Sequence, residues 1–234
     1  MRTSAIFFDL GGTLLVMRRD RIFGRVLHDA GIELDLQRIH SAYVKIEPWW
    51  LSYYGTRVMS AEQTVDAYRD LDQKVISELL PKLSESEAYR ISKLIRTRWP
   101  KLETEIPLAL YADVQPTLAR LKEDGFALGL ISNAPADTVK TVETLGLTKY
   151  LGTIVISGMV GYSKPNPEIF RIALREAGVG REESVHVGDL YEADVVGARN
   201  AGMEGVLIDR DGSHLDLDCP RISGLGDVYD YIIR

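Results

Sequence analysis

The stretch that decides the fold is Ala5-Ile6-Phe7-Phe8-Asp9-Leu10-Gly11-Gly12-Thr13-Leu14. Its apolar start predicts a strand buried on both faces, the kind found in parallel sheets. Gly11 and Gly12 end that strand and permit a sharp turn of the backbone. We therefore expect Asp9 at the carboxyl end of a central strand, where open α/β sheets bind their ligands. A carboxylate there is costly unless it is paired, metal-bound or reactive, so Asp9 is either a turn residue or an active-site group.

Composition gives no electrostatic sign of a nucleic-acid or membrane partner. The chain has 234 residues, of which 45% are hydrophobic and 26% charged, and its formal net charge is −6. It has no apolar run of about 18 residues, as a membrane span would need, and no basic segment followed by an apolar one, as a secretory signal would have. We therefore expect a cytoplasmic protein. The single Cys219 excludes an internal disulfide and a cysteine-based zinc site. The histidines lack metal-ligand spacing and are interpreted as surface or packing residues: His28, His40, His186 and His214.

Residues 17–104 contain few strand-like runs and predict a helical insert. A helix that starts at Leu36 is expected to break in the aromatic stretch 47–55. Ser60 and Ser84 are predicted to cap two further helices at their N-termini. The dipeptide Trp99-Pro100 is predicted to end the last of them, because proline disfavours a helical residue before it.

From about residue 106, strand-like and helix-like segments alternate. The predicted strands are 126–131, 153–157, 184–187 and 205–208, and the predicted helices are 114–124, 136–145, 167–177 and 194–201. This alternation predicts an α/β fold with a Rossmann-like parallel sheet and helices on both faces. The first strand has no partner close in sequence, so it must join this later sheet. We therefore expect an α/β core domain over 1–16 and 105–234, with a helical domain inserted over 17–104.

Polar side chains follow several of the predicted strands. Asp9 follows the first, Ser132 and Asn133 follow the second, and Asp189 follows a later one, while Lys164 lies in a proline-containing loop. Because parallel strands end at one edge of the sheet, we expect these groups to converge. Two facing carboxylates call for a divalent cation, and a lysine with hydroxyl and amide donors suits phosphate. Together they suit phosphoryl transfer to a carboxylate nucleophile.

The polar segments resemble, in order, the four motifs of the haloacid dehalogenase (HAD) superfamily of hydrolases. The matching segments are 7–13, 130–133, 164–170 and 187–194. The resemblance covers 5–16 and about 106–210. The insert between them is similar to the helical cap of that superfamily in position and length, although it matches no motif.

The resemblance implies that Asp9 is the nucleophile, which forms an aspartyl phosphate, and that Lys164 pairs with both Asp9 and the phosphate. It implies that Mg²⁺ binds to Asp9, Asp189 and the backbone carbonyl of Gly11. The expected substrate is a small phosphorylated metabolite. Asp194 is expected to position Lys164 or a metal-bound water, unless it only caps a helix.

The same resemblance implies three groups around the phosphoryl oxygens. Ser132 and Lys164 are expected to bind them, together with backbone amides, including that of Gly12. Asn133 either bonds the phosphate or only ends its strand, and the sequence leaves both open.

Gly11 departs from the pattern of the superfamily. Most of its phosphatases carry a second Asp at this position, which protonates the leaving oxygen and then activates water. General acid–base catalysis is typically worth about 10²–10⁴-fold. We therefore expect poor turnover of alkyl phosphates and better turnover of aryl, acyl or anhydride phosphates. An acid from the insert is a further possibility, with Glu47, His40 and Tyr53 as candidates.

Three other functions stay open. The chain is either a phosphohydrolase or a weakened relative that binds a phosphorylated ligand or a protein partner. A 2-haloacid dehalogenase is disfavoured by Asp189, which implies a metal, and by Gly11, where the dehalogenases of the superfamily carry Tyr. A phosphonatase would need a Schiff-base lysine, for which Lys45 is the candidate. Four aromatic residues cluster in the insert: Trp49, Trp50, Tyr53 and Tyr54. They either line a substrate face, pack in the core of the insert or at its hinge with the α/β core, or support a homodimer.

Overall fold

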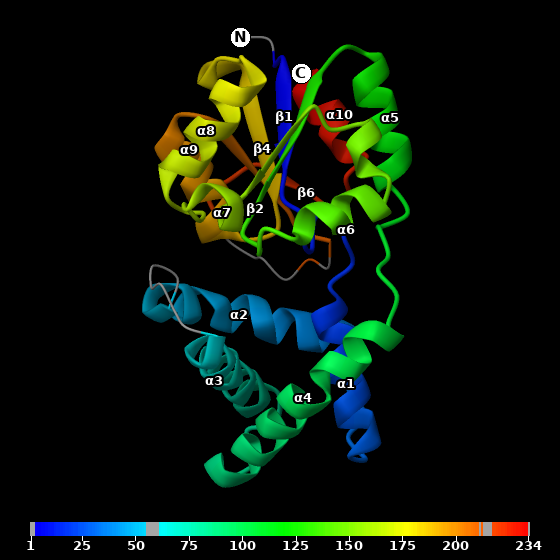
Figure 1. The fold of residues 1–234 in the computed structure, drawn as a ribbon, viewed down its shortest axis with the longest axis vertical. Helices are drawn as coiled ribbons and strands as arrows, with labels where there is room; N and C mark the ends of the chain where they lie inside the picture. Colours follow the sequence, from blue (N-terminus) through cyan, green and yellow to red (C-terminus); the bar gives the residue numbers. More distant parts are fainter. Residues whose placement is uncertain (1–2, 55–60, 211, 213–216, 234) are drawn as a thin grey trace. The chain divides into compact units, whose positions relative to one another are not determined.

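The computed structural model describes residues 3–54, 61–210, 212 and 217–233 (Figure 1). The chain divides into two compact units. One unit comprises Met1–Val16 and Leu108–Arg234, and the other comprises Met17–Pro107. In the described part of the chain, no helix has the length and apolar character that a membrane span requires.

The first unit contains a six-stranded parallel sheet with the strand order β3-β2-β1-β4-β5-β6. Its strands are β1 (Ala5–Phe8), β2 (Ala127–Ser132), β3 (Thr153–Ile156), β4 (Ser184–Gly188), β5 (Glu204–Ile208) and β6 (Arg221–Ile222). The first strand lies in the middle, where Phe8 is in register with Leu130 of β2 and Val187 of β4. The prediction that β1 joins the later sheet is therefore confirmed. The short β6 was not predicted.

Helices cover both faces of this sheet, as the sequence predicted (Figure 1). They are α5 (Val114–Glu123), α6 (Thr138–Thr144), α7 (Ser157–Val160), α8 (Pro167–Ala177), α9 (Gly197–Ala201) and α10 (Asp227–Ile232). Successive residues of β1 point to opposite faces. Ile6 and Phe8 therefore pack in one core with α5 and α10, whereas Ala5 and Phe7 pack in another with α8 and α9.

The second unit is built from four helices in the described residues: α1 (Arg18–Asp29), α2 (Leu36–Tyr54), α3 (Ala61–Leu79) and α4 (Glu85–Glu105). Its core includes the fully buried Tyr43, whose hydroxyl donates to the buried carboxylate of Asp72 at 2.9 Å. Arg96 donates to both oxygens of that carboxylate, with Nη2 2.7 Å from Oδ1 and Nε against Oδ2. A buried carboxylate is thus satisfied by two donor side chains within the helical unit.

Two helices of this unit continue where the sequence predicted a break. Helix α2 passes Pro48, and helix α4 passes Pro100. A proline inside a helix costs about 3 kcal/mol because it removes a hydrogen bond and crowds the preceding turn. Apolar residues on both sides of each proline pack against the helical core: Ile46, Trp50, Trp99 and Leu102. This packing outweighs the cost of the proline, so the predicted ends were wrong.

The capping predictions have different outcomes. Ser84 caps α4 as predicted, and it does so in a capping box: its Oγ accepts from the backbone N–H of Glu87 at 3.3 Å, and Glu87 Oε2 accepts from that of Ser84 at 2.9 Å. Ser60 lies outside the described residues.

The aromatic cluster of the insert lies on α2. Trp50 stacks on Tyr68 with 5.4 Å between ring centroids, and its indole N–H donates to the backbone oxygen of Ala67 at 3.2 Å. Trp49 stacks on Tyr53 at 6.1 Å. The side chain of Tyr54 lies outside the described residues. Trp50 packs against the helical core, while a homodimer through these aromatics stays a prediction.

The close approach of β1 and β2 generates a stability prediction. A methyl group at Gly129 would lie 2.5 Å from Cδ1 of Phe7, so the Phe7 ring or the backbone would have to move to make space for it. We expect Gly129→Ala to lower the free energy of unfolding by about 1–3 kcal/mol, measured by urea denaturation. Gly152→Ala is the matched control, because its added carbon meets nothing nearer than the Leu128 oxygen at 3.9 Å. Equal losses in the two variants would contradict this account.

Candidate active site

The nucleophile predicted from the sequence lies directly after β1. Asp9 is 7% exposed, and its backbone N–H donates to the oxygen of Val187 at 2.9 Å. The turn that follows requires glycine at position 12 for two reasons. Gly12 has φ +76°, and a Cβ there would lie 2.0 Å from Oδ2 of Asp189. The amide of Gly12 donates to the oxygen of Leu15 at 2.9 Å, so its role as a phosphate ligand stays a prediction.

Lys164 lies at the centre of the site and is 3% exposed. Its Nζ is 2.6 Å from Oδ1 of Asp9 and 2.5 Å from Oδ1 of Asp194. Burial alone would lower the pKa of Lys164, but the two carboxylates outweigh burial and raise the pKa above its ordinary value. Lys164 is therefore a permanent cation that joins two elements of the core unit. Burial raises the pKa of Asp9, and the charge of Lys164 opposes that effect.

Asp194 is fully buried and accepts three hydrogen bonds. Its Oδ1 accepts from Lys164 Nζ and from His186 Nε2 at 3.0 Å, and its Oδ2 accepts from the backbone N–H of Leu190 at 3.0 Å. Burial would raise the pKa of Asp194, but Lys164 and His186 outweigh burial and hold it below its usual range. The carboxylate is therefore held in its ionised form by a cation and two neutral donors.

The segment around Asp194 differs from the prediction of a helix over 194–201. A π-helix spans Tyr191–Val196, and only then does α9 begin. Asp194 lies inside the π-helix and is not an N-cap, so that reading of the residue was wrong. A Cβ at Gly188 would lie 2.1 Å from Cγ of Asp194, so the glycine that ends β4 leaves the space this carboxylate occupies.

Ser132 and Asn133 lie at the end of β2. The Ser132 side chain is buried, and Asn133 is tied to the lysine loop. Asn133 Nδ2 donates to the backbone oxygen of Lys164 at 2.8 Å, and its Oδ1 accepts from the backbone N–H of Lys164 at 2.7 Å. Both polar atoms of this amide thus hold the backbone of Lys164, a role that the sequence did not suggest.

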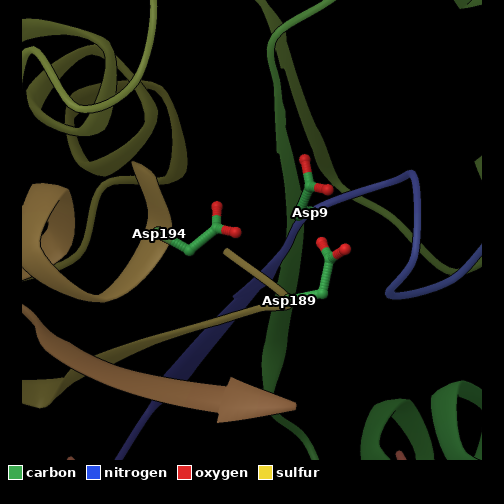
Figure 2. Close-up of side chains that lie close together, drawn as sticks. All are labelled: Asp9, Asp189 and Asp194. Carbon is green, nitrogen blue, oxygen red and sulfur yellow. The ribbon is translucent and has the colours of Figure 1, made fainter. Parts of the chain in front are cut away.

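The carboxylates form one cluster. Each of Asp9, Asp189 and Asp194 offers an oxygen, and these oxygens lie within 4.8 Å of one another (Figure 2). Figure 2 shows Asp9 and Asp189 side by side, with Asp194 approaching from another segment. Lys164 balances only part of this negative charge, and carboxylate oxygens are the ligands that Mg²⁺ prefers. The donor set therefore fits a divalent cation. Both oxygens of Asp194 already accept hydrogen bonds, so Asp9 and Asp189 are the better ligands.

His186 was not recognised as a site residue from the sequence. It is fully buried in the middle of β4, and its Nε2 faces Asp194. A histidine between two valines of a buried strand, three residues before Asp189, is the signal that could have identified it. His214 lies outside the described residues.

Two of the candidates in the helical unit, His40 and Lys45, have partners within that unit. His40 Nδ1 lies 2.9 Å from Oδ2 of Asp20. Burial would raise the pKa of Asp20, but Arg19 and His40 outweigh burial and lower it. Lys45, the candidate for a Schiff base, is exposed and pairs with Glu78 at 2.6 Å. Tyr53 is exposed, and the side chain of Glu47 lies outside the described residues.

Known proteins are similar to this chain in sequence and in fold. A glyceraldehyde 3-phosphate phosphatase of Methanopyrus kandleri is 44% identical over 111 residues, 46% of this chain and 46% of that protein. Another, of Pyrococcus furiosus, is 28% identical over 227 residues, 93% of this chain and 85% of that protein. The crystal structure of a HAD phosphatase from Thermococcus onnurineus has a TM-score of 0.58 and 25% identity, covering 99% of this chain and 98% of that one.

The extent of these matches differs between whole-chain and partial relatives. The chain spans about half the length of three curated relatives that it matches, namely 46%, 41% and 51%. The family model described as haloacid dehalogenase-like hydrolase, in contrast, matches residues 3–202. That match includes all four segments that carry the polar cluster. The chain therefore belongs to the haloacid dehalogenase-like hydrolases.

Proposed function

We propose that the protein is a Mg²⁺-dependent phosphohydrolase that acts on a small phosphorylated metabolite through an aspartyl phosphate on Asp9. One observation carries the proposal: the buried ammonium of Lys164 lies 2.6 Å from Asp9, inside a cluster of carboxylates at the ends of neighbouring strands. The names of several relatives support it, since they are phosphatases of glyceraldehyde 3-phosphate and phosphoserine, and a pyrophosphatase. We also propose that the helical unit is the cap domain of this family.

In this proposal, Asp9 attacks phosphorus and the leaving oxygen departs, after which water hydrolyses the acyl phosphate. Lys164 holds Oδ1 of Asp9, which leaves the other oxygen as the nucleophile. Lys164 and the hydroxyl of Ser132 bind the phosphoryl oxygens. Asp9, Asp189 and the backbone carbonyl of Gly11 would hold Mg²⁺, which supplies positive charge to the phosphoryl oxygens.

Gly11 limits this chemistry. It offers no side chain to protonate a leaving oxygen, so substrates whose leaving groups depart as stable anions are favoured. The role of this position can be tested by substitution, because Gly11 does not share the positive φ of Gly12. A side chain at position 11 is therefore compatible with the backbone as it stands.

The function is tested by phosphate release from a panel of alkyl, aryl and acyl phosphates and a pyrophosphate, with and without Mg²⁺. We expect Mg²⁺-dependent turnover, faster for the aryl, acyl and anhydride substrates. Asp9→Asn keeps the size of the side chain but not the nucleophile, and should lower kcat by roughly 10³-fold or more. No turnover by the wild-type protein would favour the ligand-binding alternative. Metal-independent halide release from a 2-haloacid would favour a dehalogenase.

The role of the residue at position 11 is tested separately. We expect Gly11→Asp to raise alkyl-phosphate turnover by up to about 10²–10⁴-fold, because it supplies the missing acid and base. Gly11→Asn is the matched control, since it has the same shape but does not transfer a proton. Equal rates in the two folded variants would show that proton transfer is not what the wild-type site lacks.

Asn133 is proposed to position Lys164 through its two backbone hydrogen bonds. Asn133→Ala should lower the free energy of unfolding by about 1–3 kcal/mol and kcat by roughly 10- to 100-fold, because the ammonium is less well placed. Asn166→Ala is the control. It removes the N-cap bond to Glu168 in the same loop, and should cost about 1 kcal/mol of stability with kcat unchanged. A similar loss of kcat in both variants would contradict a specific role for Asn133.

A further inference from the structure

A buried histidine belongs to the same network without touching Asp9. His186 has no exposed surface, and the ring of Phe170 packs edge-on against it with 5.2 Å between centroids. Its Nε2 lies 3.0 Å from Oδ1 of Asp194. Its Nδ1 is also buried and has no hydrogen-bond partner among the residues that the structure describes.

This geometry selects one form of the imidazole. A nitrogen that faces an ionised carboxylate must donate, so the proton is on Nε2. A second proton on Nδ1 would leave a charged ring with a buried donor unsatisfied, which is costly. Burial also lowers the pKa of His186, against the opposing effect of Asp194. His186 is thus a neutral, fixed donor.

His186 is connected to Asp9 through two charged side chains, Asp194 and Lys164. Asp194 Oδ2 is held by the backbone N–H of Leu190, and Oδ1 is shared between His186 and Lys164. With one oxygen tied to the backbone, the bond from His186 fixes where the other lies. That oxygen is one of the two carboxylate contacts of Lys164 Nζ, and the second is Asp9.

We propose that His186 is a positioning residue: its Nε2–H holds Asp194 Oδ1 so that Asp194 fixes the ammonium of Lys164 against Asp9. The inference rests on the proposed phosphohydrolase function for its effect on rate. The hydrogen bond itself does not depend on that function and is measurable without substrate.

The first test is the tautomer of His186 in the wild-type protein. Long-range ¹H–¹⁵N correlation spectra distinguish a proton on Nε2 from one on Nδ1, and the signals of His186 are those missing from the spectrum of His186→Gln. A neutral ring with the proton on Nε2 is expected. A proton on Nδ1 alone, or a doubly protonated ring at neutral pH, would overturn the proposal.

The second test separates the hydrogen bond from packing. His186→Leu fills the site without a donor, and should lower kcat by about 10–100-fold, with KM changed less than about 3-fold. His186→Gln places an amide N–H near the position of Nε2, and should restore kcat to within about 3-fold of wild type. Phe170→Leu is the control for packing, expected to lower Tm while kcat is retained.

Several results would contradict the inference. These are a wild-type kcat in His186→Leu, an equal loss in the Leu and Gln variants, or a loss in Phe170→Leu as large as in His186→Leu. If His186→Leu does not fold, a folded His186→Gln with less than a tenth of the wild-type kcat would also overturn it. Failure of the wild-type protein to release phosphate would refute the proposed function and with it the effect on rate. The tautomer measurement would still show whether His186 donates a hydrogen bond to Asp194.

Discussion

The core unit depends on one buried ammonium between two carboxylates. Lys164 Nζ contacts Asp9 and Asp194, and all three side chains are almost completely removed from solvent. Removing charges from water is expensive, and only close, well-oriented partners compensate for it. The contact therefore forms only when the end of β1, the loop before α8 and the π-helix Tyr191–Val196 all reach their places. The site is therefore built by three separate segments of the core unit.

Two glycines make this assembly sterically possible. At Gly12 a side chain would occupy the position of the Asp189 carboxylate, and at Gly188 it would occupy that of Asp194. Gly12 lies in the turn after β1 and Gly188 ends β4, so both resemble ordinary turn residues in the sequence. In the structure they are required because a carboxylate packs against the backbone at each. The acidic cluster thus dictates where glycine must lie.

The sequence predicted what depends on local pattern and strand order. Buried strands that end in polar residues located Asp9 and Asp189, because parallel strands share an edge. It could not predict contacts made by tertiary packing. The π-helix that turns Asp194 inward has no signature of its own, and the roles of Asn133 and His186 follow from partners 31 and 8 residues away. For the same reason the helices that pass Pro48 and Pro100 were missed, since packing on both sides outweighs a local preference.

The charge of the cluster bears on why position 11 is glycine. The site already holds Asp9, Asp189 and Asp194 against the single ammonium of Lys164. Burial already raises the pKa of Asp9, and another carboxylate beside it would raise that pKa further, which would weaken Asp9 in its proposed role as nucleophile. Without a fourth carboxylate, Asp9 is easier to keep ionised, but no group at this position donates a proton to the leaving oxygen. In the proposed mechanism, glycine at position 11 therefore gives up assistance to the leaving group but keeps Asp9 easier to ionise, which would favour substrates whose leaving groups depart as stable anions.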